Sequence, residues 1–194
     1  APVNVYDFDH TIYPGDSTLD FWRFCVKRRP SALLALPGAV LAGGLFKTGL
    51  LSREAFKARF YRFLRHVPGV EGEISRFWEE NLSRIYPWYL EQRREDDLII
   101  SASPEFLILP ACALLGVRGL ASPVSPETGE LLGPNCRGEE KAVRLRRAFP
   151  EENIDSFYSD SRSDAPLARL AGQAWLVEKG TPRSWPQSWW EATK

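Results

Sequence analysis

The stretch that most constrains this chain is Asn4-Val5-Tyr6-Asp7-Phe8-Asp9-His10-Thr11, because a short apolar run ends abruptly in two carboxylates. Such a run is typical of the first strand of a parallel sheet. Ligands of parallel α/β sheets bind outside the carboxyl ends of the strands, so we expect Asp7 where a catalytic group would lie. Taken alone, the stretch fits an ordinary strand followed by an Asp-rich turn as well as it fits a catalytic motif, and later segments must decide.

Strand and helix signals alternate in the second half of the chain. Ser103-Pro104-Glu105 is expected to begin a helix, with Ser103 as its N-cap, and Gly116 is expected to end it. The segment 125–130 has hairpin-turn chemistry and predicts a small flap. The alternation favours an α/β fold with a doubly wound, mostly parallel sheet. We predict strands at 97–101, 119–122, 154–159 and 174–177, and further helices at 139–148 and 165–171.

The first two predicted strands are separated by a long segment with helical periodicity. It begins with the N-cap candidates Asp16, Ser17 and Thr18, and bulky apolar residues then recur at three-to-four spacing, with no strand signal. We therefore predict a helical insert that acts as a lid or a brace. The predicted domains are an α/β core formed by 1–14 and 96–194, and a helical cap formed by 15–95.

Composition narrows the classes of function. Lys+Arg and Asp+Glu number 25 each, which gives no support for a nucleic-acid partner. Cys25, Cys112 and Cys136 form no C-x-x-C pair or disulfide framework, and no signal segment begins the chain, so we expect a cytoplasmic location. With only His10 and His66, which we interpret as incidental, a zinc site or a Ser-His-Asp triad has few candidates.

Polar residues follow three of the predicted strands and the start of one helix. Acids clustered at strand ends suit Mg²⁺, which binds through one or two carboxylates and a substrate phosphate, while hydroxyls and a lysine can hold the anion. Each residue alone has an ordinary structural explanation, but their joint placement at element boundaries favours a site. The set comprises Asp7, Asp9, Ser101, Lys141, Asp160 and Asp164.

These motifs resemble those of the haloacid dehalogenase (HAD) superfamily, in its phosphoserine-phosphatase-like branch, whose helical cap follows the first motif. The resemblance covers nearly the whole chain. It rests on Asp7-Phe8-Asp9-His10-Thr11, Ile99-Ile100-Ser101, Gly138-Glu139-Glu140-Lys141 and Tyr158-Ser159-Asp160-Ser161-Arg162-Ser163-Asp164.

The resemblance implies a Mg²⁺-dependent phosphatase and a role for each matching residue. Asp7 would be the nucleophile that forms an aspartyl-phosphate, and Asp9 the general acid and base. An acid at position 9 favours a phosphatase over an ATPase that must preserve its phospho-aspartate. Mg²⁺ would be held by Asp7, the backbone carbonyl of Asp9, and Asp160. Phosphoryl oxygens would be bound by Thr11, Ser101, Ala102 and Lys141, with Asp164 orienting Lys141 or a metal-bound water.

Two departures from the branch bear on the substrate. Ala102-Ser103 replaces the usual glycine pair, and Ser163 replaces an asparagine. Asp16 lies where the branch has an acid that binds a substrate amine, but it is also an N-cap candidate. Cap arginines Arg59, Arg62 and Arg65 are candidates for a substrate anion, although a solvated helix face explains them as well. We expect a small phosphorylated metabolite other than phosphoserine, bound by a monomer or homodimer.

The segment 31–46 carries no charge and is preceded by Lys27-Arg28-Arg29. A membrane span needs about 20 apolar residues, and Pro37-Gly38 should interrupt this one. We expect the segment to pack between the helices of the cap. The alternative is an exposed surface that forms a dimer or touches a membrane, where the enzyme would act on a lipid-linked phosphate. A second alternative for the whole chain is a catalytically inactive HAD-fold binding module.

Overall fold

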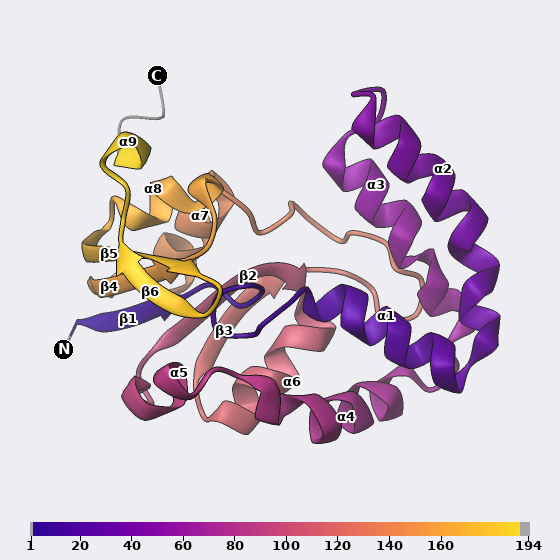
Figure 1. The fold of residues 1–194 in the computed structure, drawn as a ribbon, viewed down its shortest axis with the longest axis horizontal. Coiled ribbons are helices and arrows are strands. Elements are labelled where there is room, and N and C mark those ends of the chain that lie inside the picture. The colour runs from indigo at the N-terminus through magenta and orange to yellow at the C-terminus, as the bar shows by residue number, and fades with distance from the viewer. Residues whose placement is uncertain (1, 191–194) are drawn as a thin grey trace.

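The computed structural model describes residues 2–190 and contains one six-stranded sheet (Figure 1). The strand order is β3-β2-β1-β4-β5-β6, parallel throughout except for the antiparallel β5–β6 pair. The predicted doubly wound, mostly parallel sheet is therefore confirmed. Its strands are β1 (Val3–Tyr6), β2 (Leu98–Pro104), β3 (Arg118–Ser122), β4 (Ile154–Ser159), β5 (Ala171–Glu178) and β6 (Thr181–Ser184).

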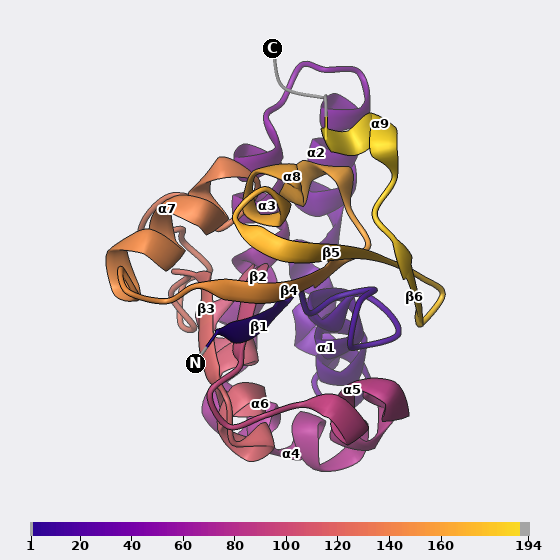
Figure 2. The same ribbon diagram turned by 90° about the vertical axis from the view of Figure 1, so that its left-hand side faces the viewer.

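Helices cover both faces of this sheet (Figures 1 and 2). On one face, α6 packs over Tyr6, Ile99 and Ala121, and on the other, α7 and α8 pack over Val5 and Ile100. Successive strand residues thus alternate between two buried clusters, as a sheet covered on both sides requires. These helices are α6 (Glu105–Leu115), α7 (Glu139–Ala148) and α8 (Ala165–Ala168); a short α9 (Gln187–Trp190) follows β6.

Three predicted boundaries in the core are wrong. The helix predicted over 165–171 ends at Ala168, and Ala171 already belongs to β5. β2 extends to Pro104, so Ser103 lies within the strand and does not cap α6, which begins at Glu105. The strand continues because Pro104 still pairs with Ser122 of β3, and the Ser103 hydroxyl is bonded to Asp9, far away in sequence. Residues 174–177 do not form the last strand, since β6 follows. Lys179 and Gly180, both with positive φ, form a tight turn that pairs β6 with β5.

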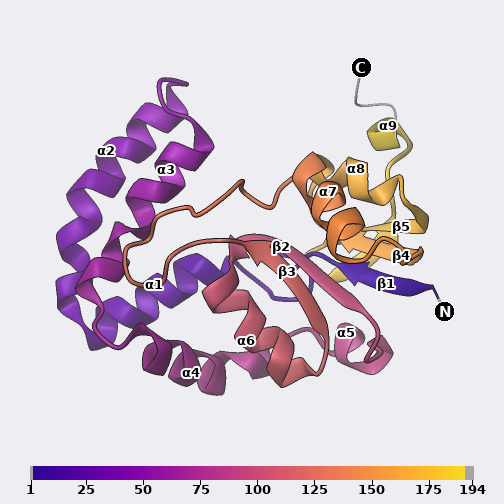
Figure 3. The ribbon, with the colours of Figure 1, turned by 180° about the vertical axis from the view of Figure 1, so that it is seen from behind.

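Every element between β1 and β2 is a helix (Figure 3). α2 and α3 form a hairpin that projects away from the sheet, with α3 on the side toward the core and α2 on the outside (Figures 1 and 3). α1 and α4 pack against the core face that also carries α6. The elements are α1 (Ser17–Arg28), η1 (Pro30–Ala35), α2 (Leu36–Lys47), α3 (Arg53–Phe60), η2 (Tyr61–His66), α4 (Val70–Asn81), η3 (Leu82–Arg84) and α5 (Pro87–Gln92), where η denotes a 3₁₀ helix.

The expected burial of segment 31–46 is wrong. Leu34, Val40 and Leu41 are 70%, 65% and 62% exposed, and only alanines of the segment are buried. Pro37 lies in the first turn of α2, where a proline costs no helical hydrogen bond, so it does not interrupt the helix. Among the described residues, Pro30–Lys47 is the one helical run that is long and apolar enough to cross a membrane, judged by length and composition only.

Candidate active site

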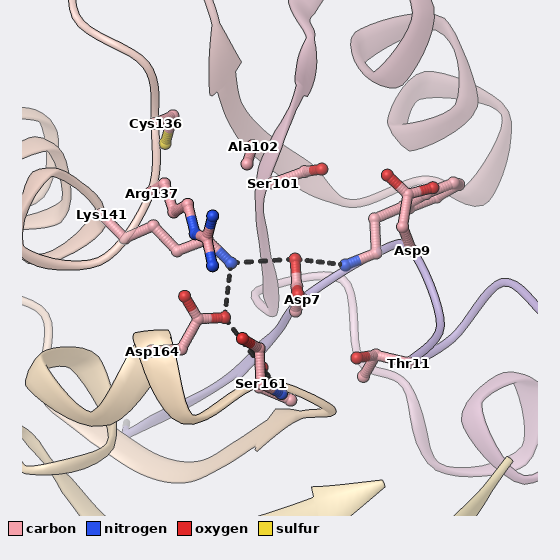
Figure 4. Close-up of polar contacts among 12 residues, drawn as sticks. Asp7, Asp9, Thr11, Ser101, Ala102, Cys136, Arg137, Lys141, Ser161 and Asp164 are labelled. Carbon is pink, nitrogen blue, oxygen red and sulfur yellow. Dashed lines mark hydrogen bonds and ion pairs between the residues drawn. The ribbon is translucent and has the colours of Figure 1, made fainter. Parts of the chain in front are cut away.

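Lys141, in the first turn of α7, lies at the centre of a buried ion-pair cluster (Figure 4). Its Nζ is 2.9 Å from Asp7 Oδ1 and 2.7 Å from Asp164 Oδ2. Ser159 Oγ donates a hydrogen bond of 2.8 Å to the same Asp164 oxygen. Burial lowers the pKa of Lys141, but the charges of Asp164 and Asp7 outweigh burial and raise the pKa above its ordinary value. Lys141 is therefore a permanent cation beside Asp7.

Asp7 leaves the sheet where β1 ends. Its backbone N–H still pairs with the Tyr158 carbonyl of β4, and its Oδ1 accepts a hydrogen bond of 2.8 Å from the N–H of Phe8. Burial raises the pKa of Asp7 to about 7 against the opposing charge of Lys141, and repulsion by Asp164 and Asp160 adds to the rise. The site therefore holds more negative charge than its lysine compensates.

Asp9 lies at the N-terminus of α1. Its Oδ1 accepts a 2.7 Å hydrogen bond from the N–H of Ser17, and its Oδ2 accepts one from the Ser103 hydroxyl. Burial raises the pKa of Asp9 to about 6, Asp16 raises it further, and the hydrogen bonds from Ser103 and Ser17 lower it. A carboxyl with this pKa can release and accept a proton near neutral pH, as general acid–base catalysis requires.

These residues line a cavity of about 410 Å³ between the sheet and the helical insert. The volume lies in the range of pockets for small molecules. The structure brings together at its wall, from separate segments, the predicted residues Asp7, Asp9, Asp16, Ser101, Ala102, Lys141, Asp160 and Asp164.

Four predicted residues lie outside this cavity wall. Thr11 is fully buried outside the cavity wall, and its hydroxyl accepts a hydrogen bond of 3.1 Å from the N–H of Asp160. In this position Thr11 orients the loop that carries Asp160. Arg59, Arg62 and Arg65 line a separate groove on the insert, so the structure does not bring them to the active-site cavity. The periodicity of the insert placed these arginines on a helix face but could not show which face the core covers.

Asp16 combines a structural position with a place on the cavity wall. It is the N-cap of α1, where its Oδ1 accepts a hydrogen bond of 2.8 Å from the N–H of Leu19. This bond accounts for one of the otherwise unpaired donors of the first helical turn. Its contact with a substrate amine stays a prediction.

The sequence did not reveal a cationic and aromatic part of the wall formed by the insert and one loop. Lys57 of α3 donates hydrogen bonds to the Ala102 carbonyl and Asn135 Oδ1, at 2.8 and 2.9 Å. Arg53 and Arg137 also line this wall, and the pKa of Arg53 is lowered by burial and then by the nearby charge of Arg137. The aromatic residues of this wall are Phe46, Phe56, Phe60 and Tyr61.

His10, interpreted as incidental from the sequence, also lines the cavity. Its φ of 57° lies in the left-handed region, which a residue with a side chain seldom adopts. Its N–H donates to the Gly15 carbonyl at 3.1 Å, which closes the loop between β1 and α1. Burial raises the pKa of Asp160, and the charge of His10 opposes that rise.

The donor set suits a hard divalent cation. No group of three or more His, Cys, Asp or Glu side chains among residues 2–190 is arranged to hold a metal by itself. Mg²⁺ needs fewer, because it is bound by one or two carboxylates and completes its shell with water and substrate phosphate. Asp7 and Asp160 are two such carboxylates on one cavity, and the raised pKa of each indicates a local shortage of positive charge.

The fold and the site define an α/β enzyme that uses aspartates and a lysine at the carboxyl ends of parallel strands. The chain belongs to the haloacid dehalogenase-like hydrolase family, whose model matches residues 5–169. This membership confirms the superfamily that the motifs resembled.

Two relatives match part of the chain. Protein CicA of Caulobacter vibrioides is 31% identical over 93 residues, which cover 44% of this chain and 42% of the relative. Histidinol-phosphatase of Neisseria meningitidis serogroup C is 30% identical over 112 residues, which cover 47% of this chain and 50% of the relative. The chain thus spans half or less of the length of these relatives.

Solved structures share the fold over most of the chain. A protein with unknown function from Bordetella pertussis Tohama I has a TM-score of 0.68 at 20% identity, covering 89% of this chain and 88% of its own. A probable phosphoserine phosphatase from Vibrio cholerae has a TM-score of 0.66 at 13% identity, covering 90% and 55%. At these identities the likeness supports the fold alone.

Proposed function

We propose that this protein is a Mg²⁺-dependent phosphatase that hydrolyses a small phosphomonoester through an aspartyl-phosphate at Asp7. The observation that carries the proposal is the contact of Asp7 with Lys141 at one cavity that Asp9 also lines. Membership of a hydrolase family, and a relative named as a histidinol-phosphatase, support it. We also propose 15–95 as the cap of the enzyme, and a reducing location such as the cytoplasm, where its free cysteines are stable.

The reaction proceeds in two displacements at phosphorus. The Asp7 carboxylate attacks, the bond to the leaving oxygen breaks, and Asp9 donates its proton to that oxygen. Asp9 then takes a proton from a water molecule, which attacks the aspartyl-phosphate, releases phosphate and regenerates Asp7. Lys141 and Ser101 bind the phosphoryl oxygens, and Asp164 fixes Lys141 through the 2.7 Å ion pair. The buried cation is preorganised, so it stabilises developing charge without reorienting.

Asp7, Asp160 and the backbone carbonyl of Asp9 are the groups that would hold Mg²⁺. When bound, the ion supplies the positive charge that offsets repulsion between the phosphate and the carboxylates. Asp7 in particular needs this positive charge. Its carboxylate must be ionised to act as a nucleophile, and its raised pKa opposes ionisation.

The direct test measures phosphate release from p-nitrophenyl phosphate and from a panel of small phosphomonoesters. We expect turnover that is lost on chelation of Mg²⁺ and restored by adding it back. Asp7→Asn should abolish turnover, because an amide cannot form the acyl phosphate. Inactivity of the wild type against the whole panel, or full activity of Asp7→Asn, would show the proposal to be wrong.

A binding experiment separates this enzyme from an inactive HAD-fold module. Beryllium fluoride with Mg²⁺ mimics an acyl phosphate on Asp7 and should stabilise an intact site by mass action. We expect a rise in Tm for the wild type and none for Asp7→Asn. An unchanged Tm for both proteins would favour the inactive module.

A lipid-linked phosphate is the second candidate substrate. The observation that favours it is Phe46 of α2, which lines the cavity, stacks on Phe56 at 5.5 Å and belongs to the same helix as the exposed Val40 and Leu41. The helix that exposes these apolar side chains thus also contributes an aromatic ring to the cavity wall. Glycerol 3-phosphate, which has no acyl chain, and lysophosphatidic acid, which has one, carry the same kind of phosphate. A much higher kcat/KM for the acylated ester would favour the lipid substrate over a small metabolite.

A further inference from the structure

Helix α2 is apolar on all sides yet mostly uncovered. A helix of this composition is normally buried in a protein core or in a membrane. Pro37, Val40, Leu41 and Gly44 lie at positions i, i+3, i+4 and i+7 of one exposed helix face, and Leu50 after α2 is 75% exposed. Because α3 lies between α2 and the core, this face looks away from the rest of the molecule (Figures 1 and 3).

Positive charge is concentrated around this apolar face. The whole chain is balanced, but segment 27–66 contains nine Lys and Arg residues and a single acid, Glu54. Arg28 and Arg29 are partly neutralised by Glu73 of α4, whereas Lys47 at the end of α2 is exposed. The combination of an apolar stripe with a basic surround is typical of helices that lie in the interface of an anionic membrane.

A groove of about 260 Å³ adds a place for anionic groups beside the apolar face. On one side it is lined by Leu34 of η1 and Gly38 of α2, and on the other by three arginines and His66. Within residues 2–190, Arg59 and Arg62 have no carboxylate within ion-pair distance, and Arg65 pairs with Glu130 at 3.3 Å. Two of the three guanidinium groups are thus available to bind phosphate oxygens, for which their planar fork is suited.

We propose that the α2 face and the arginine groove form a docking surface for an anionic phospholipid bilayer. Leu34, Val40 and Leu41 enter the boundary of the acyl chains, while Arg59 and Arg62 bind headgroup phosphates. Electrostatic attraction and apolar burial act together at such a surface. This inference goes beyond the proposed function, because docking requires no turnover.

Two other placements of α2 fit the structure less well. A transmembrane pass would put Lys47 on the far side and force α3, with Arg53 and Lys57 on the active-site wall, to return across the bilayer at high cost. A second copy of the chain would bring two strongly basic surfaces together, and like charges oppose association.

Flotation with vesicles tests the docking surface and separates bound protein from aggregates. We expect the wild type to float with phosphatidylcholine vesicles that contain phosphatidylglycerol, less at high salt, and weakly with phosphatidylcholine alone. Leu34→Asp combined with Leu41→Asp should lower the partition coefficient about tenfold or more, because the buried apolar area is lost. Leu114→Asp on α6 is the matched control, since Leu114 is 61% exposed, and it should bind as the wild type does.

The charge contribution is tested in the same assay. Arg59→Gln with Arg62→Gln should weaken binding and flatten its salt dependence, whereas Arg146→Gln with Arg147→Gln, which removes the same charge from α7, should do neither. Each variant is checked for an unchanged Tm. Wild type that does not float with anionic vesicles, or equal loss in test and control variants, would overturn the proposal. So would a stable dimer in light scattering that the leucine changes dissociate, because it would assign the face to a second copy.

Discussion

Lys57 of the helical insert donates a hydrogen bond of 2.8 Å to the carbonyl oxygen of Ala102 on β2, next to Ser101. The bond connects α3 to the strand that forms the floor of the active-site cavity. Burial lowers the pKa of the Lys57 ammonium to about 8, and Asp16 and Asp9 oppose that shift. The insert thus contributes a charged group to the cavity wall as well as covering it.

Lys57→Met should raise KM for anionic substrates about tenfold and change kcat much less. The reason is that the ammonium attracts the substrate in the ground state and the transition state alike. Lys47→Met is the control, because it removes the same charge from the exposed end of α2. Steady-state kinetics of the two variants decide the point: equal KM values would mean that Lys57 only connects the insert to the core.

The same lysine gives a prediction about pH. A lysine is charged below its pKa, so substrate attraction is complete below about pH 8 and is lost as the pH rises through that value. KM of the wild type should therefore rise above about pH 8, while KM of Lys57→Met should change little over the same range. A parallel rise in both proteins would assign the titration to another group.

Asp9→Asn should lower kcat by about 10²–10⁴-fold, the usual contribution of a general acid and base. The amide keeps an acceptor for the N–H of Ser17 but cannot transfer a proton. Rapid acid quenching after mixing with substrate should reveal whether phosphorylated protein accumulates.

Ser103→Ala serves as a comparison. It keeps the Asp9 carboxylate and removes one hydrogen bond that lowers the pKa of Asp9, so the pH optimum of this variant should move upward. Equal kinetics of Asp9→Asn and wild type would exclude Asp9 from the chemistry.

Lys141→Met should destabilise the fold by about 3 kcal/mol, because it leaves Asp7 and Asp164 buried without their cation. Urea denaturation measures the change in the free energy of unfolding. Adding Asp164→Asn to this variant removes one of the two uncompensated charges and should recover part of the loss. If the double variant is less stable by the sum of both single effects, the ion pair is not the cause.

Much of the core could be predicted because the local sequence patterns there agree with the secondary structure that the fold requires. β4 and α7 have the predicted bounds, since a short run that ends at Asp160 and an amphipathic run after Gly138 each fit only one kind of element. Asp7, Ser101, Lys141 and Asp160 followed from these bounds, because parallel strands bring their carboxyl ends to one edge. The grouping of these residues at one site could therefore be predicted from the order of the strands and helices.

The failures arise where tertiary contacts override local patterns. Ser103 looks like a helix cap, yet its hydroxyl is bonded to Asp9 across the sheet. Lys57 looks like a solvent-facing charge, and only the approach of α3 to β2 places it on the cavity wall. Segment 31–46 is apolar and was expected to be buried, but the described part of the chain provides nothing to cover its outer face.

The free energy of unfolding of the metal-free protein should fall as the pH rises from about 4, the ordinary pKa of an aspartate, to about 7. Over this range the folded protein retains a proton on Asp7 that the unfolded chain has lost. Stability then decreases with pH, by at most about 1.4 kcal/mol per pH unit for one proton. Asp9, with a pKa raised to about 6, contributes to the lower part of the range.

Asp7→Asn removes the larger of these two titrations and leaves a neutral side chain beside Lys141, which keeps its ion pair with Asp164. We therefore expect this variant to show a flatter pH profile and to be more stable than the metal-free wild type near neutral pH, by about 1–2 kcal/mol. Chemical denaturation across the pH range measures both effects. Added Mg²⁺ should stabilise the wild type above about pH 7, where Asp7 is ionised, and the variant hardly at all. A metal-free variant that is less stable than the wild type near neutral pH would show that attraction to Lys141 outweighs the cost of burying the Asp7 charge.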